Sequence, residues 1–137
     1  MRRVIVLGVI AVAMALSTSA GAQRPATDVH ASLTCSGAVS WQRASGLVGR
    51  VATIQGRVAG TRYAASSNGS PTFLNLGVDY PNPNRVTVLI WSENRAAFGR
   101  PEVRYRGRTI CVRGRVQSYQ GVPEIVARST SQIRIIR

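Results

Sequence analysis

The sequence contains no lysine, one histidine and few acidic residues. Its 137 residues hold 18 basic side chains, all arginine, against five aspartates and glutamates, for a formal net charge of +13. No acid lies within three residues of another, whereas a calcium site needs roughly six to eight oxygen ligands. The single histidine, His30, lies in a polar segment and has no partner pattern for a nucleophile, a base and an orienting group. We therefore expect no catalytic site, no metal and no cofactor.

Long hydrophobic runs are also absent, except at the start. Residues 1–22 contain Arg2 and Arg3, an apolar run over 4–16 and the small-residue end Ala20-Gly21-Ala22. This is the order of a secretory signal peptide, and the apolar run is shorter than the ~20 residues that span a bilayer. We expect cleavage before Gln23 and an exported protein, periplasmic or secreted. No integral membrane segment would remain.

Cysteine is scarce as well, since only Cys35 and Cys111 occur. An exported chain with an even number of cysteines is expected to form a disulfide. Two unpaired thiols are the alternative. The spacing contains no C-x-x-C, which disfavours a metal site.

Removal of residues 1–22 leaves 115 residues with 16 arginines and five acids, hence a net charge of about +11. A field of that sign attracts polyanions such as nucleic acid or anionic head groups, and arginine forms forked contacts with phosphate and stacks on rings. A merely soluble cationic surface is the alternative, but it does not explain the shortage of acids. The length suits one domain.

Residues 23–46 form a flexible or irregular lead-in, in which 39–48 could be a brief helix. Strands are then expected at 48–58, 72–78 and 85–91, the last almost wholly apolar and thus buried on both faces. A short helix over 93–98, capped by Ser92 or Asn94, precedes strands at 108–119 and 122–128, with a possible continuation at 132–136. Pro81 and Pro83 stiffen the turn between the second and third strands.

Three strands, one short helix and two strands are the order of the OB-fold, a five-stranded, partly open Greek-key barrel. The order also explains a repeated pattern, GRVATIQGRV at 49–58 and GRTICVRGRV at 107–116. In this barrel the first and fourth strands pair, and each must bend. We therefore predict that Gly56 and Gly114 are bend positions, each holding a backbone shape or a close approach that a Cβ would disturb.

The segments PTFLNLGVDYPNPN, VTVLIW, GRTICVRGRV and GVPEIVARSTSQIRI, in that order, resemble a family of bacterial OB-fold domains often labelled nucleic-acid-binding. The resemblance runs from about residue 47 to 135, so it implies an OB-fold domain over 47–137. For the ligand it implies less, because OB barrels bind oligonucleotides, sugars and proteins alike.

On OB barrels the ligand lies across the second and third strands, between the first–second and fourth–fifth loops. Single-stranded nucleic acid is held there by aromatic stacking and by cations along the backbone. Strand parity leaves open whether Phe73 faces the ligand or the core, and Trp91 is more typical of packing than of stacking. The candidate binding residues are Arg62, Tyr63, Phe73, Asn75, Arg85, Arg113 and Tyr119.

Two hypotheses follow. The first is a non-enzymatic module that binds single-stranded nucleic acid or another polyanion without sequence preference, because no base-reading motif is visible. The second is an envelope adaptor that binds a protein or a small molecule on the barrel face. The positive charge favours the first, and export favours the second.

Overall fold

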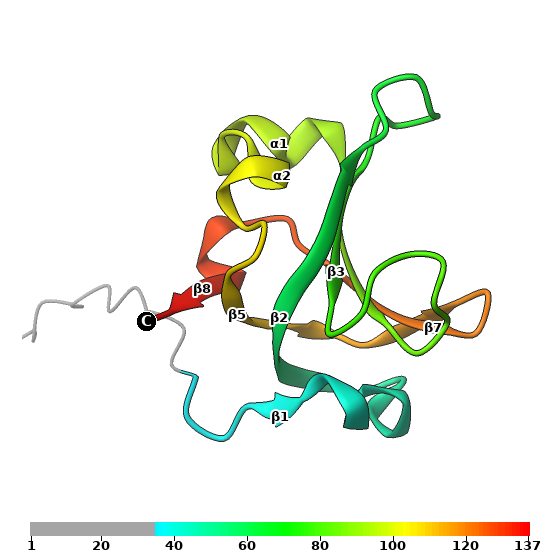
Figure 1. Ribbon diagram of the computed structural model, residues 1–137, viewed down its shortest axis with the longest axis vertical. Helices are drawn as coiled ribbons and strands as arrows, with labels where there is room; N and C mark the ends of the chain where they lie inside the picture. The colour runs from blue at the N-terminus through cyan, green and yellow to red at the C-terminus, as the bar shows by residue number, and fades with distance from the viewer. Residues whose placement is uncertain (1–34) are drawn as a thin grey trace, which may run out of the picture.

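A computed structural model describes residues 35–137 (Figure 1). The expected signal peptide and His30 lie outside the described residues. Within them, no helix is long and apolar enough to cross a membrane. The elements in chain order are β1 (Val39–Ser40), η1 (Trp41–Leu47), β2 (Val51–Tyr63), β3 (Thr72–Leu76), β4 (Val86–Ile90), α1 (Ser92–Phe98), α2 (Pro101–Arg104), β5 (Thr109–Arg115), β6 (Gln117–Tyr119), β7 (Val122–Val126), η2 (Thr130–Gln132) and β8 (Ile133–Ile136).

The strands form one sheet in the order β6-β7-β4-β3-β2-β5-β8, with β1 added beside β2. β4 and β7 are parallel, as are β1 and β2, and the other neighbours are antiparallel. The long strand β2 pairs first with β5 and then with β3, and it runs through the height of the molecule (Figure 1). α1 and α2 lie at one end of β2, and β1 and η1 lie at the other.

Five of these strands, β2, β3, β4, β5 and β7, have the connections expected of an OB-type Greek key. The predicted count of five strands is wrong, because β1, β6 and β8 raise it to eight. The sheet is also not closed, since β5 and β7 are not hydrogen-bonded neighbours. A second short helix, α2, occupies the expected linker after Gly99, because Pro101 suits the first turn of a helix.

The core follows the predicted alternation. Ile54 and Val58 on β2 are fully buried, as are Leu74 and Leu76 on β3, so side chains of one parity on each strand point inward. Every residue of β4 is buried, as its almost wholly apolar sequence predicted. The buried cluster continues through β5, β7 and the helix residue Phe98.

The pairing of the two glycine-bearing strands is confirmed, with Gly56 opposite Ile110 and Gly114 opposite Ala52. Close approach is the reason for both glycines. A Cβ on Gly56 would lie 3.0 Å from Cδ1 of Trp41, and one on Gly114 would lie 2.6 Å from Cγ2 of Ile125. A positive φ is not the reason at either position.

Several boundaries differ from the prediction. The register of β2 against β3 shifts between Val58 and Gly60, so the irregularity lies beyond Gly56. Neither Ser92 nor Asn94 caps α1, whose N-cap is Trp91 without a side-chain hydrogen bond. The single strand expected over 108–119 is divided at Val116, whose N–H and C=O bond to residues 50 and 49.

The ordered domain begins before residue 47. Residues 39–47, assigned to the irregular lead-in, form β1 and η1, and Ala44 of η1 is fully buried in the core. Cys35 is bonded to Cys111 on β5, with the two Cα atoms 5.9 Å apart. The predicted disulfide is therefore present, and it ties the start of the described chain to the sheet.

Candidate functional site

A groove of ≈ 670 Å³ lies on the outer face of β3, β4 and β7. Its walls are the turn of residues 79–84 and the β6–β7 hairpin, which project on the same side of the molecule (Figure 1). The groove therefore occupies the face on which an OB-type barrel carries its ligand. Five of the predicted binding residues line it: Arg62, Phe73, Asn75, Arg85 and Tyr119.

The orientation of Phe73 is settled by the register. Phe73 alternates with the fully buried Leu74, so its ring faces the groove and is only partly covered. It pairs with Arg62 on β2 and with Leu89 on β4. Arg62 and Phe73 are therefore neighbours at the groove wall.

Tyr80 and Tyr119 supply two further rings from opposite walls. Tyr80 is 68% exposed and Tyr119 is 61% exposed. The guanidinium of Arg85 lies 5.1 Å from the centre of the Tyr80 ring, within the range of a cation–π contact. Tyr119 precedes the hairpin turn at Gln120 and Gly121, both of which have positive φ. Tyr80 is not among the binding residues predicted from the sequence, although its position between the strand of Phe73 and Arg85 was a usable signal.

The floor of the groove is polar and buried. Asn75 on β3 donates from Nδ2 to Oδ1 of Asp79 at 2.8 Å, and Thr87 on β4 donates to Oδ1 of Asn75 at 3.4 Å. The backbone N–H of Tyr80 also donates to Oδ1 of Asp79. Gly60 makes room for this carboxylate, because a Cβ there would collide with it. Asn75 therefore organises the floor, a more structural role than the ligand contact predicted for it.

Glu124 on β7 is the second carboxyl group of the groove, and it is 6% exposed. Gln117 on β6 donates from Nε2 to its Oε1 at 2.8 Å. Burial raises the pKa of Glu124 because desolvation penalises the charged form, and the Gln117 hydrogen bond lowers it by a smaller amount. Sequence analysis missed Glu124 and Asp79, which are far apart in the chain and meet only through the β4–β7 and β3–β4 pairings.

Two predicted residues, Tyr63 and Arg113, do not line this groove. The Tyr63 ring lies 3.9 Å from the guanidinium of Arg95 on α1, and Arg95 forms a 2.7 Å ion pair with Glu102 on α2. Tyr63 therefore ties the end of β2 to the helices. Arg113 donates to Oγ1 of Thr53 at 3.3 Å on the outer face of β2 and β5.

The Trp91 ring packs against the rest of the protein and does not offer a stacking surface in the groove. It is half-buried, lies outside the lining of the groove, and contacts the loop at Gly69, where a Cβ would lie 2.8 Å from its ring. This agrees with the packing role that sequence analysis favoured.

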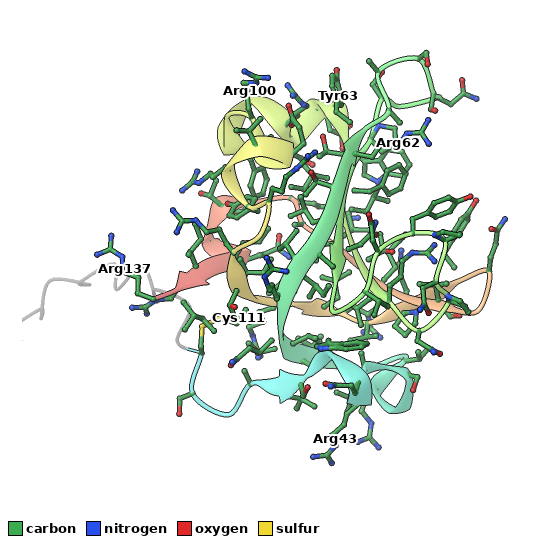
Figure 2. The ribbon with its side chains drawn as sticks, viewed as in Figure 1. Arg43, Arg62, Tyr63, Arg100, Cys111 and Arg137 are labelled. Carbon is green, nitrogen blue, oxygen red and sulfur yellow. A yellow bond between two sulfur atoms is a disulfide. The ribbon has the colours of Figure 1, made fainter. Side chains whose placement is uncertain are left out.

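The positive charge is spread over the surface rather than gathered in the groove. Arg43, Arg62, Arg100 and Arg137 lie at well-separated places (Figure 2). Two arginines, Arg62 and Arg85, line the groove, together with the two carboxyl groups. The other acids among residues 35–137, Glu93 and Glu102, lie on α1 and α2, so the outer face of β2, β5 and β8 carries arginines without acids. Within the described residues, no three histidine, cysteine or acidic side chains cluster to hold a metal.

Neither a protein-family model nor a curated protein matches the chain. Among solved structures, it is similar to a Klebsiella pneumoniae lipoprotein described as a candidate nucleic-acid binder (15% identity, 69% of this chain and 76% of that chain, TM-score 0.44). It is also similar to the E. coli protein YgiW (17% identity, 72% of this chain and 89% of that chain, TM-score 0.44). A third similar structure is the S. pombe Stn1–Ten1 complex (20% identity, 62% of this chain and 57% of that chain, TM-score 0.45). The OB-type topology rests on strand order and pairing, and no residue role is transferred from these proteins.

Proposed function

We propose that this chain is an exported, non-catalytic binding module whose groove holds single-stranded nucleic acid or a similar polyanion. One observation carries the proposal: the aromatic rings of Phe73, Tyr80 and Tyr119 and the guanidinium groups of Arg62 and Arg85 line a single groove. Stacking platforms combined with cations along a backbone path are the usual means by which single strands are bound.

The dimensions and exposure support this proposal. A groove of ≈ 670 Å³ accommodates a few nucleotides rather than a long strand. The rings of Tyr80 and Tyr119 are largely exposed on opposite walls, so bases could stack on them without any rearrangement of the core. Arg85 lies against the Tyr80 ring and Arg62 is paired with Phe73, so a phosphate that follows a base stacked near either arginine would meet a cation.

The disulfide between Cys35 and Cys111 supports an extracytoplasmic location, because disulfides persist in oxidising compartments. Together with the signal-like segment at residues 1–22, it favours a periplasmic or secreted protein. The ligand would then be nucleic acid or another polyanion encountered outside the cytoplasm.

Fluorescence anisotropy with a labelled mixed-sequence oligonucleotide of about ten nucleotides tests the proposal, since OB folds occupy about 4–16 nucleotides. We expect Phe73→Ala, Tyr80→Ala and Tyr119→Ala each to weaken binding by ~1–3 kcal/mol. The matched control is Tyr63→Ala, which removes a ring outside the groove. Unchanged affinity in all three groove variants would contradict the proposal.

A second candidate, an envelope adaptor that binds a small molecule or a protein, is favoured by the charge balance of the groove. Asp79 and Glu124 offset Arg62 and Arg85 there, so the groove itself is not strongly cationic. If heparin competes as well as any oligonucleotide and the aromatic variants bind like the parent, the net charge alone accounts for polyanion binding and the adaptor function is favoured.

A further inference from the structure

We infer that the groove discriminates among nucleobases, and that Glu124 and Asp79 favour bases with an exocyclic amino group over thymine and uracil. The inference rests on the proposed function and refines it, because sequence analysis gave no reason to expect any base preference.

The polar side chains of the floor form a row across three strands. Asn75 on β3 is opposite Thr87 on β4, and Thr87 is in turn opposite Glu124 on β7. All three are at least nine-tenths buried and line the groove. Phe73 and Tyr119 also line it, so the edge of a base stacked on either ring would point toward this row.

The hydrogen bonds of the row direct its donors at its own acceptors. The Thr87 hydroxyl donates to Asn75, the Asn75 amide donates to Asp79, and the Gln117 amide donates to Glu124. An ionised carboxyl group has no donor and about four lone-pair sites. Asp79 and Glu124 therefore keep acceptor capacity, because these hydrogen bonds reach only Oδ1 of Asp79 and Oε1 of Glu124, and each carboxylate can accept a further N–H group from a ligand.

Nucleobases differ in whether they can donate an N–H group to these carboxylates. Cytosine presents an N4 amino donor where thymine presents the O4 acceptor, and Glu or Asp accepting from cytosine N4 is a known pairing. Thymine would place its O4 carbonyl oxygen against the buried carboxylate of Glu124, where neither group can donate a hydrogen bond. Cytosine and thymine have similar stacking areas, so a comparison of their affinities reports mainly the hydrogen bonds to the groove floor.

The test compares binding of labelled oligo-dC and oligo-dT of about ten nucleotides to the full chain by anisotropy above pH 7, a range chosen to favour the ionised form of Glu124 because burial raises its pKa. We expect oligo-dC to bind at least about fivefold more tightly, the lower end of discrimination by one base contact. Glu124→Gln should bring the ratio toward one, because the amide can donate to thymine O4. Glu93→Gln, on the exposed first turn of α1, makes the same charge change and should keep the ratio.

Asp79→Asn is the second variant, and circular dichroism verifies that each variant is folded. Equal binding of the two oligonucleotides by the parent, or tighter binding of oligo-dT, would overturn the base preference and leave the proposed function standing. A preference that survives in both Glu124→Gln and Asp79→Asn would also overturn it. If neither oligonucleotide binds, the proposed function itself fails.

Discussion

The side-chain amide of Gln132 donates a hydrogen bond to the carbonyl oxygen of Arg113 at 3.0 Å. The same nitrogen lies 3.3 Å from the carbonyl oxygen of Val126. Arg113 belongs to β5 and Val126 to β7, the two strands that do not pair with each other. One side chain therefore bridges the opening in the barrel, next to the close approach at Gly114.

Replacement of Gln132 by Ala should lower the free energy of unfolding by ~0.5–1.5 kcal/mol for each hydrogen bond lost, because the carbonyl groups of Arg113 and Val126 lose their side-chain donor. Its Oε1 also accepts from the backbone N–H groups of Arg128 and Ser129, so the entry to η2 would loosen as well. Urea denaturation measures the effect. Gln42→Ala, at an exposed position of η1, serves as the control and should stay within about 0.5 kcal/mol of the parent.

Gly114→Ala should destabilise the fold by more than ~1 kcal/mol, because the added methyl group would overlap Ile125 in a packed region. Gly46→Ala is the matched control, since a Cβ there meets nothing within 4 Å. Thermal melting compares the two variants. Equal melting temperatures would rule out close packing as the reason for glycine at residue 114.

Loss of the disulfide should cost about 4 kcal/mol in the chain-entropy model, because the bond closes a loop with a sequence separation of 76 residues. Cys35→Ser should therefore melt well below the parent in the absence of a reductant. Under reducing conditions the two proteins should converge. Titration of the unfolded, unreduced parent should detect no free thiol from this pair, and two thiols would contradict the structure.

Glu124→Gln should stabilise the protein at neutral pH. The pKa of Glu124 is raised by burial, so the folded state holds its proton more tightly than the unfolded state, and folding becomes less favourable as pH rises above the unfolded pKa. The amide keeps its hydrogen-bond capacity toward Gln117 and has no charge to desolvate. The advantage of the variant over the parent should be present at pH 7 and should shrink as pH falls toward 4, as measured by melting curves at each pH.

Arginines in and outside the groove should differ in their effects on ligand binding. Arg62→Ala should remove one phosphate contact. The slope of the logarithm of the binding constant against the logarithm of the salt concentration should then become shallower by ~0.7, because fewer counterions are released on binding. Arg113→Ala, on the other face, should change the slope much less. If both variants change it equally, binding depends on overall charge rather than on the groove.

The sequence predicted the features that depend on local periodicity. The apolar run of β4, the alternation of β2 and the pairing of β2 with β5 follow from apolar spacing and from the repeated glycine pattern. It did not predict that Val116 would divide the last long strand, because that break depends on hydrogen bonds to residues 49 and 50, more than 60 positions away.

Only some of the residues that line the groove could be predicted from the sequence. The position of a strand end predicted Arg62, whereas strand parity left the orientation of Phe73 open, and Asp79 and Glu124 are 45 positions apart. No motif links them, and only the parallel pairing of β4 and β7 brings them to one floor. Tyr63 lies outside the groove because it follows Arg62 on β2, and adjacent residues of a strand point to opposite faces.

Because the sheet is open, it ends in two strands, and both are poor templates for another chain. β6 has three residues and β8 has four, which leaves few backbone groups for an added strand to pair with. β8 carries Arg134, and all three residues of β6 are exposed, two of them polar. Short edges with charged or polar side chains are how natural sheets resist edge-to-edge aggregation. A strongly basic chain with this arrangement should remain monodisperse at concentrations where a long, apolar sheet edge would promote fibre formation.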